Sequence, residues 1–264
     1  MSSFQVANNL ELIRYIPYLF SVAIALFFVI GWGSGKYLIK KSDGIVVRDS
    51  IAAAIFGLSA LVLGFTFSNS ANHFNERASN IRSQAASLER LYSSTRFLNA
   101  ADQAVVRRSL HELLELNLST FKTAHNIDEL ENNFRLTTNM LDEISEQIVL
   151  AIPRAPAETK ELADKLLRPH LDSLVTTFRQ AILDAKNHPP SMVIIFLFIL
   201  LCIGALLSGY AMAIEKQEDW LLTPIYLFLI GYALFVIFSL EFPNELLNFD
   251  SVNSDLLRLK KIIG

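Results

Sequence analysis

Residues 51–68, IAAAIFGLSALVLGFTFS, continue directly into residues 69–92, NSANHFNERASNIRSQAASLERLY. The first stretch is apolar and uncharged, whereas the second alternates polar and apolar residues in the manner of a helix with a solvated face. No proline interrupts the chain between Trp32 and Pro153, and proline inside a helix breaks or kinks it. The sequence therefore predicts one long helix that begins inside a membrane and continues beyond it.

A polar stripe follows one face of this predicted helix and begins inside its apolar part. Polar groups at membrane depth are costly unless they face protein or water. The stripe therefore predicts either helix packing or a water-filled path. At helical spacing, its members are Ser59, Thr66, Ser70, His73, Arg77, Asn80, Gln84 and Ser87.

The composition indicates a membrane protein, because 52% of the 264 residues are hydrophobic and only 19% are charged. Four runs lack Asp, Glu, Lys and Arg, and each is long enough to cross a hydrocarbon core of roughly 30 Å as a helix. We therefore expect an all-α membrane protein with four transmembrane helices and a helical soluble domain inserted between helices 2 and 3. The four runs are 15–35, 50–75, 189–214 and 220–240.

The polar middle of the chain carries helix-start signals. Asn99 followed by Asp102 and Asn126 followed by Glu129 have the spacing of N-terminal caps, and Pro156 suits the opening of a further helix. The C-terminal tail is expected to be a solvated amphipathic segment. The expected boundaries are an N-terminal tail 1–14, transmembrane helices 15–35, 50–69, 190–214 and 220–241, the helical soluble domain 70–188, and the C-terminal tail 242–264.

Several classes of protein are disfavoured. The net charge of −3 and the absence of a basic cluster argue against a nucleic-acid partner. No phosphate-binding glycine loop, zinc-protease motif or nucleophile elbow is present, so we expect no enzyme activity and no cofactor. The five histidines lack the spacing of a helical metal site, and a solvated helix face explains His111 with Glu112 and Glu115 better than a metal does.

Residues 57–92, GLSALVLGFTFSNSANHFNERASNIRSQAASLERLY, resemble the second-span region of a bestrophin-like family of uncharacterised bacterial membrane proteins, which is distantly similar to the bestrophin channels. The layout of two spans, a helical insertion and two further spans is also similar. LEFP, residues 240–243, lies where that family carries acidic residues followed by an arginine, a proline, an aromatic residue and a glycine. The arginine and the glycine are missing here.

The resemblance implies a passive ion channel built as a homo-oligomer, pentameric in bestrophins, with the second span lining a central pore. Its partners would be other copies of the chain, membrane lipids and permeating inorganic ions. An apolar constriction at Leu63 would gate such a pore by dewetting. Phe67 and Phe74, about 100° further round the helix, are an alternative constriction. The candidate pore-lining residues are Phe56, Ser59, Leu63, Thr66, Ser70, His73 and Arg77.

The ion is expected to be an anion rather than a monovalent cation, because Arg77 would place a positive ring at the pore mouth. Glu76 is its neighbour in the sequence. A rotation of the helix by one residue would replace the positive ring of Arg77 with a negative ring of Glu76, and the pore would then favour cations. The stripe also has a packing interpretation, in which Gly57 and Gly64 allow helices to approach closely and the hydroxyls bond across the contact. The alternative function is a non-conducting membrane scaffold or envelope sensor built on the helical soluble domain.

The orientation in the membrane has conflicting signals. Lys36, Lys40, Lys41 and Arg48 lie in the loop between the first two spans, and the positive-inside rule places that loop in the cytoplasm. The resemblance implies the reverse. We follow the resemblance and expect an integral protein of the bacterial inner membrane with both termini and the soluble domain in the cytoplasm.

Overall fold

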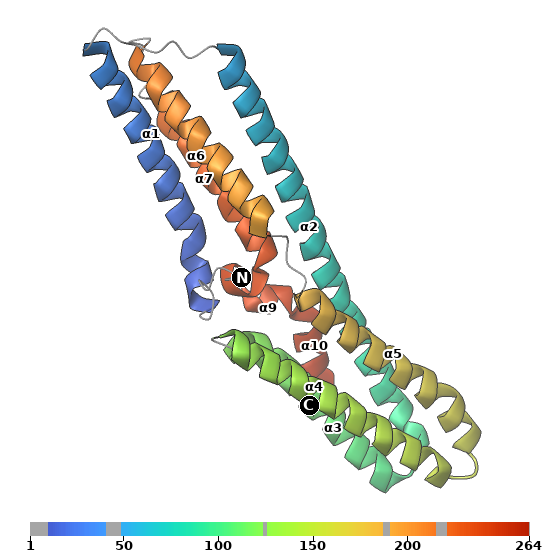
Figure 1. Cartoon of the computed structure of the whole chain (residues 1–264). Coiled ribbons are helices and arrows are strands. Elements are labelled where there is room, and N and C mark those ends of the chain that lie inside the picture. The colour runs from blue at the N-terminus through green and yellow to red at the C-terminus, as the bar shows by residue number, and fades with distance from the viewer. Residues whose placement is uncertain (1–9, 41–48, 124–125, 187–190, 215–220, 264) are drawn as a thin grey trace. The chain divides into compact units, whose positions relative to one another are not determined.

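The computed structural model describes residues 10–40, 49–123, 126–186, 191–214 and 221–263, and every regular element within them is a helix. The all-α fold class predicted from the sequence is therefore confirmed (Figure 1). The α-helices are α1 Ile16–Lys40, α2 Asp49–Ser94, α3 Ala100–Thr123, α4 Ile127–Ala151, α5 Lys160–Lys186, α6 Ser191–Ile214, α7 Leu222–Glu241, α8 Pro243–Leu246, α9 Phe249–Val252 and α10 Ser254–Ile263. Short 3-10 turns cover Leu10–Tyr15, Thr95–Phe97 and Ile152–Arg154.

Four helices are long and apolar enough to cross a membrane, as predicted: they lie within Ile13–Leu38, Ser50–Phe97, Met192–Ile214 and Leu222–Glu241. The second of them belongs to α2, which is a single helix of 46 residues. At 1.5 Å per residue α2 is about 70 Å long, more than twice the hydrocarbon thickness of a bilayer. The predicted continuity of this helix is confirmed.

The chain forms two compact units. The membrane unit comprises residues 13–73 and 188–242, and the helical unit comprises residues 1–12, 74–187 and 243–264. The helix α2 contributes its first part to the membrane unit and its second part to the helical unit.

In the membrane unit, α1 packs along α6 with the backbones in direct contact. A Cβ atom on Gly31 would overlap the carbonyl oxygen of Leu206, and one on Gly209 would overlap that of Phe28. Gly35 is similarly close to Ala213, since a Cβ atom would lie 2.6 Å from the alanine Cβ. Small residues permit this approach where the surrounding lipid is as apolar as the side chains and dispersion contacts dominate.

The helical unit is built around a core of leucine and isoleucine side chains from α2, α3, α4 and α5. In Figure 1, α3 and α4 run side by side within this unit. The fully buried members of the core include Leu88, Leu91, Leu110, Leu113, Leu114, Leu141, Ile144, Ile148, Leu167, Leu174 and Phe178.

The C-terminal segment differs from the prediction. Instead of being a solvated tail, it ends in α10, whose Leu256 and Leu259 are buried in the core of the helical unit. The spacing of three residues places both leucines on one face of α10, and that face packs on α3. Lys260 Nζ also pairs with Glu115 Oε1 at 2.7 Å.

The predicted helix starts are largely confirmed. Asn126 Oδ1 accepts from the Glu129 amide at 2.8 Å and Asn126 Nδ2 donates to Glu129 Oε1 at 3.0 Å, which caps α4 reciprocally. Asn99 Oδ1 accepts from the Asp102 amide at 2.9 Å. Pro156 does not open α5: it begins a turn in which its carbonyl accepts from the Lys160 amide, and the helix starts at Lys160.

Candidate functional site

The first part of the polar stripe of α2, from Ser59 to His73, lies inside the membrane unit. Ser59, Thr66 and Ser70 are 6%, 5% and 1% exposed. The Ser59 hydroxyl donates to the Ile55 carbonyl at 2.7 Å, and the Thr66 hydroxyl donates to the Val62 carbonyl at 2.8 Å. Both hydroxyls are therefore satisfied by their own helix. Their burial within the chain fits the packing interpretation of the stripe.

Two apolar candidates share this covered face. A Cβ atom on Gly204 of α6 would lie 3.3 Å from the ring of Phe56. Leu63 is partly buried against the core of the membrane unit, whose members come from α1, α6 and α7. Both residues therefore contribute to packing within the chain.

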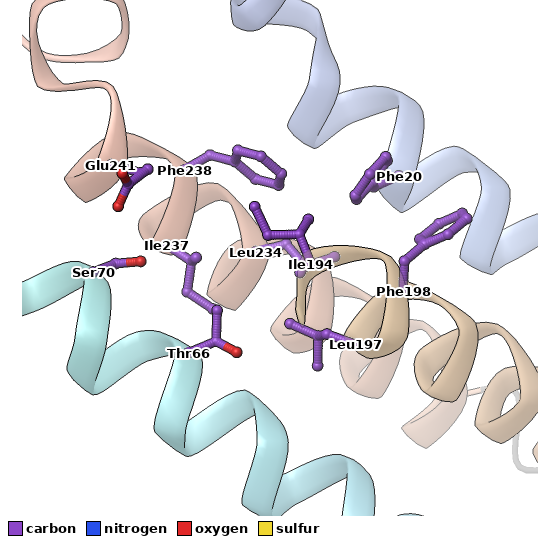
Figure 2. A pocket seen from close by; sticks show the side chains of 10 residues that line it. All are labelled: Phe20, Thr66, Ser70, Ile194, Leu197, Phe198, Leu234, Ile237, Phe238 and Glu241. Atoms are coloured by element: carbon purple, nitrogen blue, oxygen red, sulfur yellow. The ribbon is translucent and has the colours of Figure 1, made fainter. Parts of the chain in front are cut away.

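A small cavity of about 20 Å³ lies in the membrane unit (Figure 2). This volume is sufficient for about one water molecule. Most of the lining is apolar, and the polar groups are the hydroxyls of Thr66 and Ser70 and the carboxylate of Glu241. The lining residues are Phe20 from α1, Thr66 and Ser70 from α2, Ile194, Leu197 and Phe198 from α6, and Leu234, Ile237, Phe238 and Glu241 from α7.

An acidic residue and a histidine meet beside this cavity. Glu241, the last residue of α7, is 3% exposed, and its Oε2 lies 3.4 Å from Nδ1 of His73 on α2. His73 was predicted as a site residue, but Glu241 was not, although the LEFP segment that contains it was noted. The signal in the sequence was a carboxylate at the end of an apolar span.

The opposite face of α2 is open in the single chain. Leu61 is 56% exposed and Phe65 is 68% exposed. A Cβ atom on Gly57 or Gly64 would have no neighbour within 4 Å among the described residues. Only 11% of the apolar window of α2 is buried, the lowest share of the four membrane helices. This open face is therefore available to lipid or to another copy of the chain.

The remaining candidates divide between the two faces. Phe67 and Glu76 are exposed, whereas Phe74 and Arg77 are partly covered. Arg77 follows His73 by one helical turn and lies on the same side of α2 as the stripe, while Glu76 lies towards the open side. Glu76 therefore lies on the more accessible side of α2, and Arg77 lies on the more covered side.

The stripe continues into the helical unit as buried or half-buried groups that form hydrogen bonds. Asn80 donates to Asp184 at 2.6 Å, Ser87 bonds Thr177 at 2.9 Å and Ser94 bonds Nδ1 of His170 at 2.7 Å. Successive members are seven residues apart on α2 and seven apart on α5. Gln84 lies between Asn80 and Ser87 on α2. Its Oε1 accepts a hydrogen bond from Nδ2 of Asn117 on α3 at 3.4 Å.

In the part of the chain that the structure describes, no group of three His, Cys, Asp or Glu side chains could hold a metal ion. His111 Nε2 lies 3.8 Å from Glu115 Oε1 on the surface of α3, and Cys202 is a buried free thiol. The contact between His111 and Glu115 fits a solvated helix surface, and Cys202 packs in the apolar core of the membrane unit.

No protein-family model matches the sequence, and no curated protein matches it either. The fold, in contrast, matches that of solved structures. The chain superposes on a single-residue variant of a bestrophin homologue from Klebsiella pneumoniae with a TM-score of 0.63 at 17% identity, covering 92% of this chain and 98% of that one. A second structure of a bestrophin homologue from Klebsiella pneumoniae gives 0.59 at 17% identity over 92% and 98%.

The class of protein follows from the fold: with four apolar helices and a bundle of amphipathic ones, this is an integral membrane protein. Its fold is that of the bacterial bestrophin homologues, which confirms the similarity inferred from residues 57–92.

Proposed function

We propose that the chain is the subunit of an oligomeric ion channel in which α2 lines a central pore. The observation that carries this proposal is the open apolar face of α2, which belongs to the least covered membrane helix of the chain. The bestrophin fold supports a homo-oligomer, and a homopentamer is the arrangement that the resemblance implies. Membrane lipids would cover the remaining outer surfaces.

The pore-lining face in this proposal is the open face rather than the polar stripe. Ser59, Thr66 and Ser70 are covered within the chain, whereas Leu61, Phe65 and Ser68 are exposed along one side of α2. Rings of Leu61 and Phe65 would form an apolar constriction that closes by dewetting. Gly57 and Gly64 lie beside this row of exposed residues on α2. Their small size would allow the helix of a neighbouring copy to approach closely.

The selectivity that this placement supports is for monovalent cations. Glu76 is exposed towards the open side of α2, while Arg77 lies on the covered side with His73. Rings of acidic side chains favour cations in channels. The expectation of an anion required Arg77 to face the pore. The stripe residues that precede Arg77 on the same side of α2 are buried, and this burial supports Glu76 at the pore instead.

The test is ion flux through the purified protein in liposomes, with potassium and chloride measured separately. We expect Leu61→Ala and Phe65→Ala to increase the flux severalfold, since each removes apolar bulk from the constriction. Leu63→Ala is the matched control because it is the same substitution on the covered face. If none of the variants passes either ion, the channel proposal is wrong.

The membrane orientation belongs to the same proposal. We place the protein in the bacterial inner membrane with the helical unit in the cytoplasm, as the resemblance implies. A reporter enzyme fused after residue 264 that is active only inside the cytoplasm would support this orientation. Activity only outside would reverse it.

A second candidate function is a non-conducting scaffold that binds partners through the helical unit. Exposed apolar side chains on α4 and α5 favour it, notably Val149, Leu150 and Leu183. Exposed apolar side chains on a folded domain are candidates for contacts with a partner. Serine substitutions at these three positions that abolish co-purification of a partner, in a protein without ion flux, would favour this alternative.

A further inference from the structure

One side of α4 combines negative charge with exposed apolar side chains. Glu143 and Glu146 are exposed there, and Val149 and Leu150 are 49% and 54% exposed. With 3.6 residues per turn, the four positions lie within about 120° of one another around the helix. The residues of α4 that enter the core of the helical unit lie on the opposite side. We call the four exposed residues the acidic patch.

The outer side of α10 carries the opposite charge. Leu256 and Leu259 are buried in the core of the helical unit, whereas Arg258 and Lys261 are exposed. Ile262 beside them is 63% exposed. These three exposed positions lie within about 100° of one another, on the side of α10 away from the core. We call them the basic patch.

The charges of both patches are unpaired within the chain. No described residue forms an ion pair with Glu143 or Glu146, and the same holds for Arg258 and Lys261. An exposed charge alone is solvated and requires no partner. Exposed apolar side chains beside the charges favour a protein partner, because interfaces combine an apolar centre with a polar rim.

The two patches complement each other. Each combines two charges of a single sign with exposed apolar surface, and the signs are opposite. In a closed ring of identical chains the interface is heterologous, so it joins two different surfaces of the subunit. The acidic and basic patches lie on different helices and meet this requirement. Complementary charges also select the correct partner and its register.

We propose that the acidic patch of one chain binds the basic patch of a second copy, so that the C-terminal helix α10 joins neighbouring subunits. This inference rests on the homo-oligomer in the proposed function and names surfaces of the helical unit that hold it together. Val149 and Leu150, which a scaffold would use for a different partner, are then covered by the neighbouring copy.

The first test is disulfide cross-linking in isolated membranes of the expressing cells. Cys202→Ala removes the single native cysteine, and Glu146→Cys and Lys261→Cys are then added to the same chain. After mild oxidation we expect a ladder of bands beyond the dimer on a denaturing gel, because each subunit is joined to both of its neighbours. Glu89→Cys with Lys261→Cys is the matched control and should give no ladder, since Glu89 is an exposed glutamate of α2 outside both patches.

The second test is charge reversal with rescue in the purified full-length protein. Glu143→Lys with Glu146→Lys places like charges opposite the basic patch, so we expect the oligomeric fraction to fall severalfold at about 0.15 M salt. Adding Arg258→Glu and Lys261→Glu restores opposite charges and should restore the oligomer. Glu89→Lys is the control and should leave it unchanged. Light scattering measures the oligomeric fraction, and circular dichroism shows that each variant is folded.

Three results would overturn the proposal. The first is an intact oligomer that gives no ladder, from this cysteine pair or from Glu143→Cys with Arg258→Cys, and loses nothing on charge reversal; other surfaces would then hold the ring, and the channel proposal would be unaffected. The second is a ladder that ends at the dimer. The third is a monomeric native protein, which would also overturn the homo-oligomer of the proposed function. A full ladder without ion flux would contradict conduction alone.

Discussion

The amide of Asn80 on α2 donates a hydrogen bond of 2.6 Å to the carboxylate of Asp184 on α5, and the pairing repeats at seven-residue steps along both helices. Ser87 bonds Thr177 and Ser94 bonds His170 in the same register. A shift of one helical turn would separate all three pairs at once. This polar ladder therefore fixes the register of α5 on α2 within the helical unit.

The last step of the ladder predicts a measurable stabilisation. Ser94→Ala removes the hydroxyl that bonds Nδ1 of His170, and we expect a loss of about 1 kcal/mol in the free energy of unfolding. Denaturant unfolding of the purified protein measures it. Ser93→Ala is the matched control, because Ser93 is exposed one position earlier, and equal losses for the two variants would contradict the assignment.

The close contact of α1 with α6 predicts a strong size limit at Gly31. Gly31→Ala places a Cβ against the Leu206 carbonyl, and we expect a loss of about 1–3 kcal/mol because the backbones must separate. The thermal midpoint in detergent is the measurement. Gly33→Ala, which has open space around it among the described residues, should leave the midpoint nearly unchanged. A larger effect at Gly33 than at Gly31 would be incompatible with this packing.

The docking of α10 predicts that the C-terminus stabilises the helical unit. Leu256→Ala empties a buried position in the core, and we expect a loss of about 2–5 kcal/mol. Ile262→Ala, at an exposed position of the same helix, is the control. Lys260→Ala should cost about 1 kcal/mol or less, because its pair with Glu115 is solvent-exposed. Equal midpoints for the Leu256 and Ile262 variants would show that α10 is not docked.

The placement of Glu76 predicts the sign of ion selectivity if the protein conducts. Glu76→Gln should lower the ratio of potassium to chloride flux severalfold, since it removes a ring of negative charge from the pore mouth. Arg77→Gln should change the ratio less, because Arg77 lies on the covered side of α2. Liposome flux with each ion separately measures both. A larger change for Arg77→Gln would return the arginine to the pore and restore the expectation of an anion.

Much of the fold could be predicted because its signals are local. The uncharged runs, the absence of proline between Trp32 and Pro153 and the caps at Asn99 and Asn126 each depend on residues close together in the sequence. The C-terminal leucines were recognised as amphipathic, but their partner is α3, far earlier in the chain. Local periodicity shows that a face is apolar and does not show what covers it.

The sequence by itself determined that α2 is one helix with a polar face and an apolar face, because helical periodicity follows from the backbone alone. Only the tertiary structure decided which face is covered. Ser59 and Thr66 are buried while Leu61 and Phe65 are exposed, and Thr66 lines a cavity together with side chains of α6 and α7. The tertiary structure also brought Glu241 to His73, since a contact between two helices that are far apart in the chain has no signature in the order of the residues.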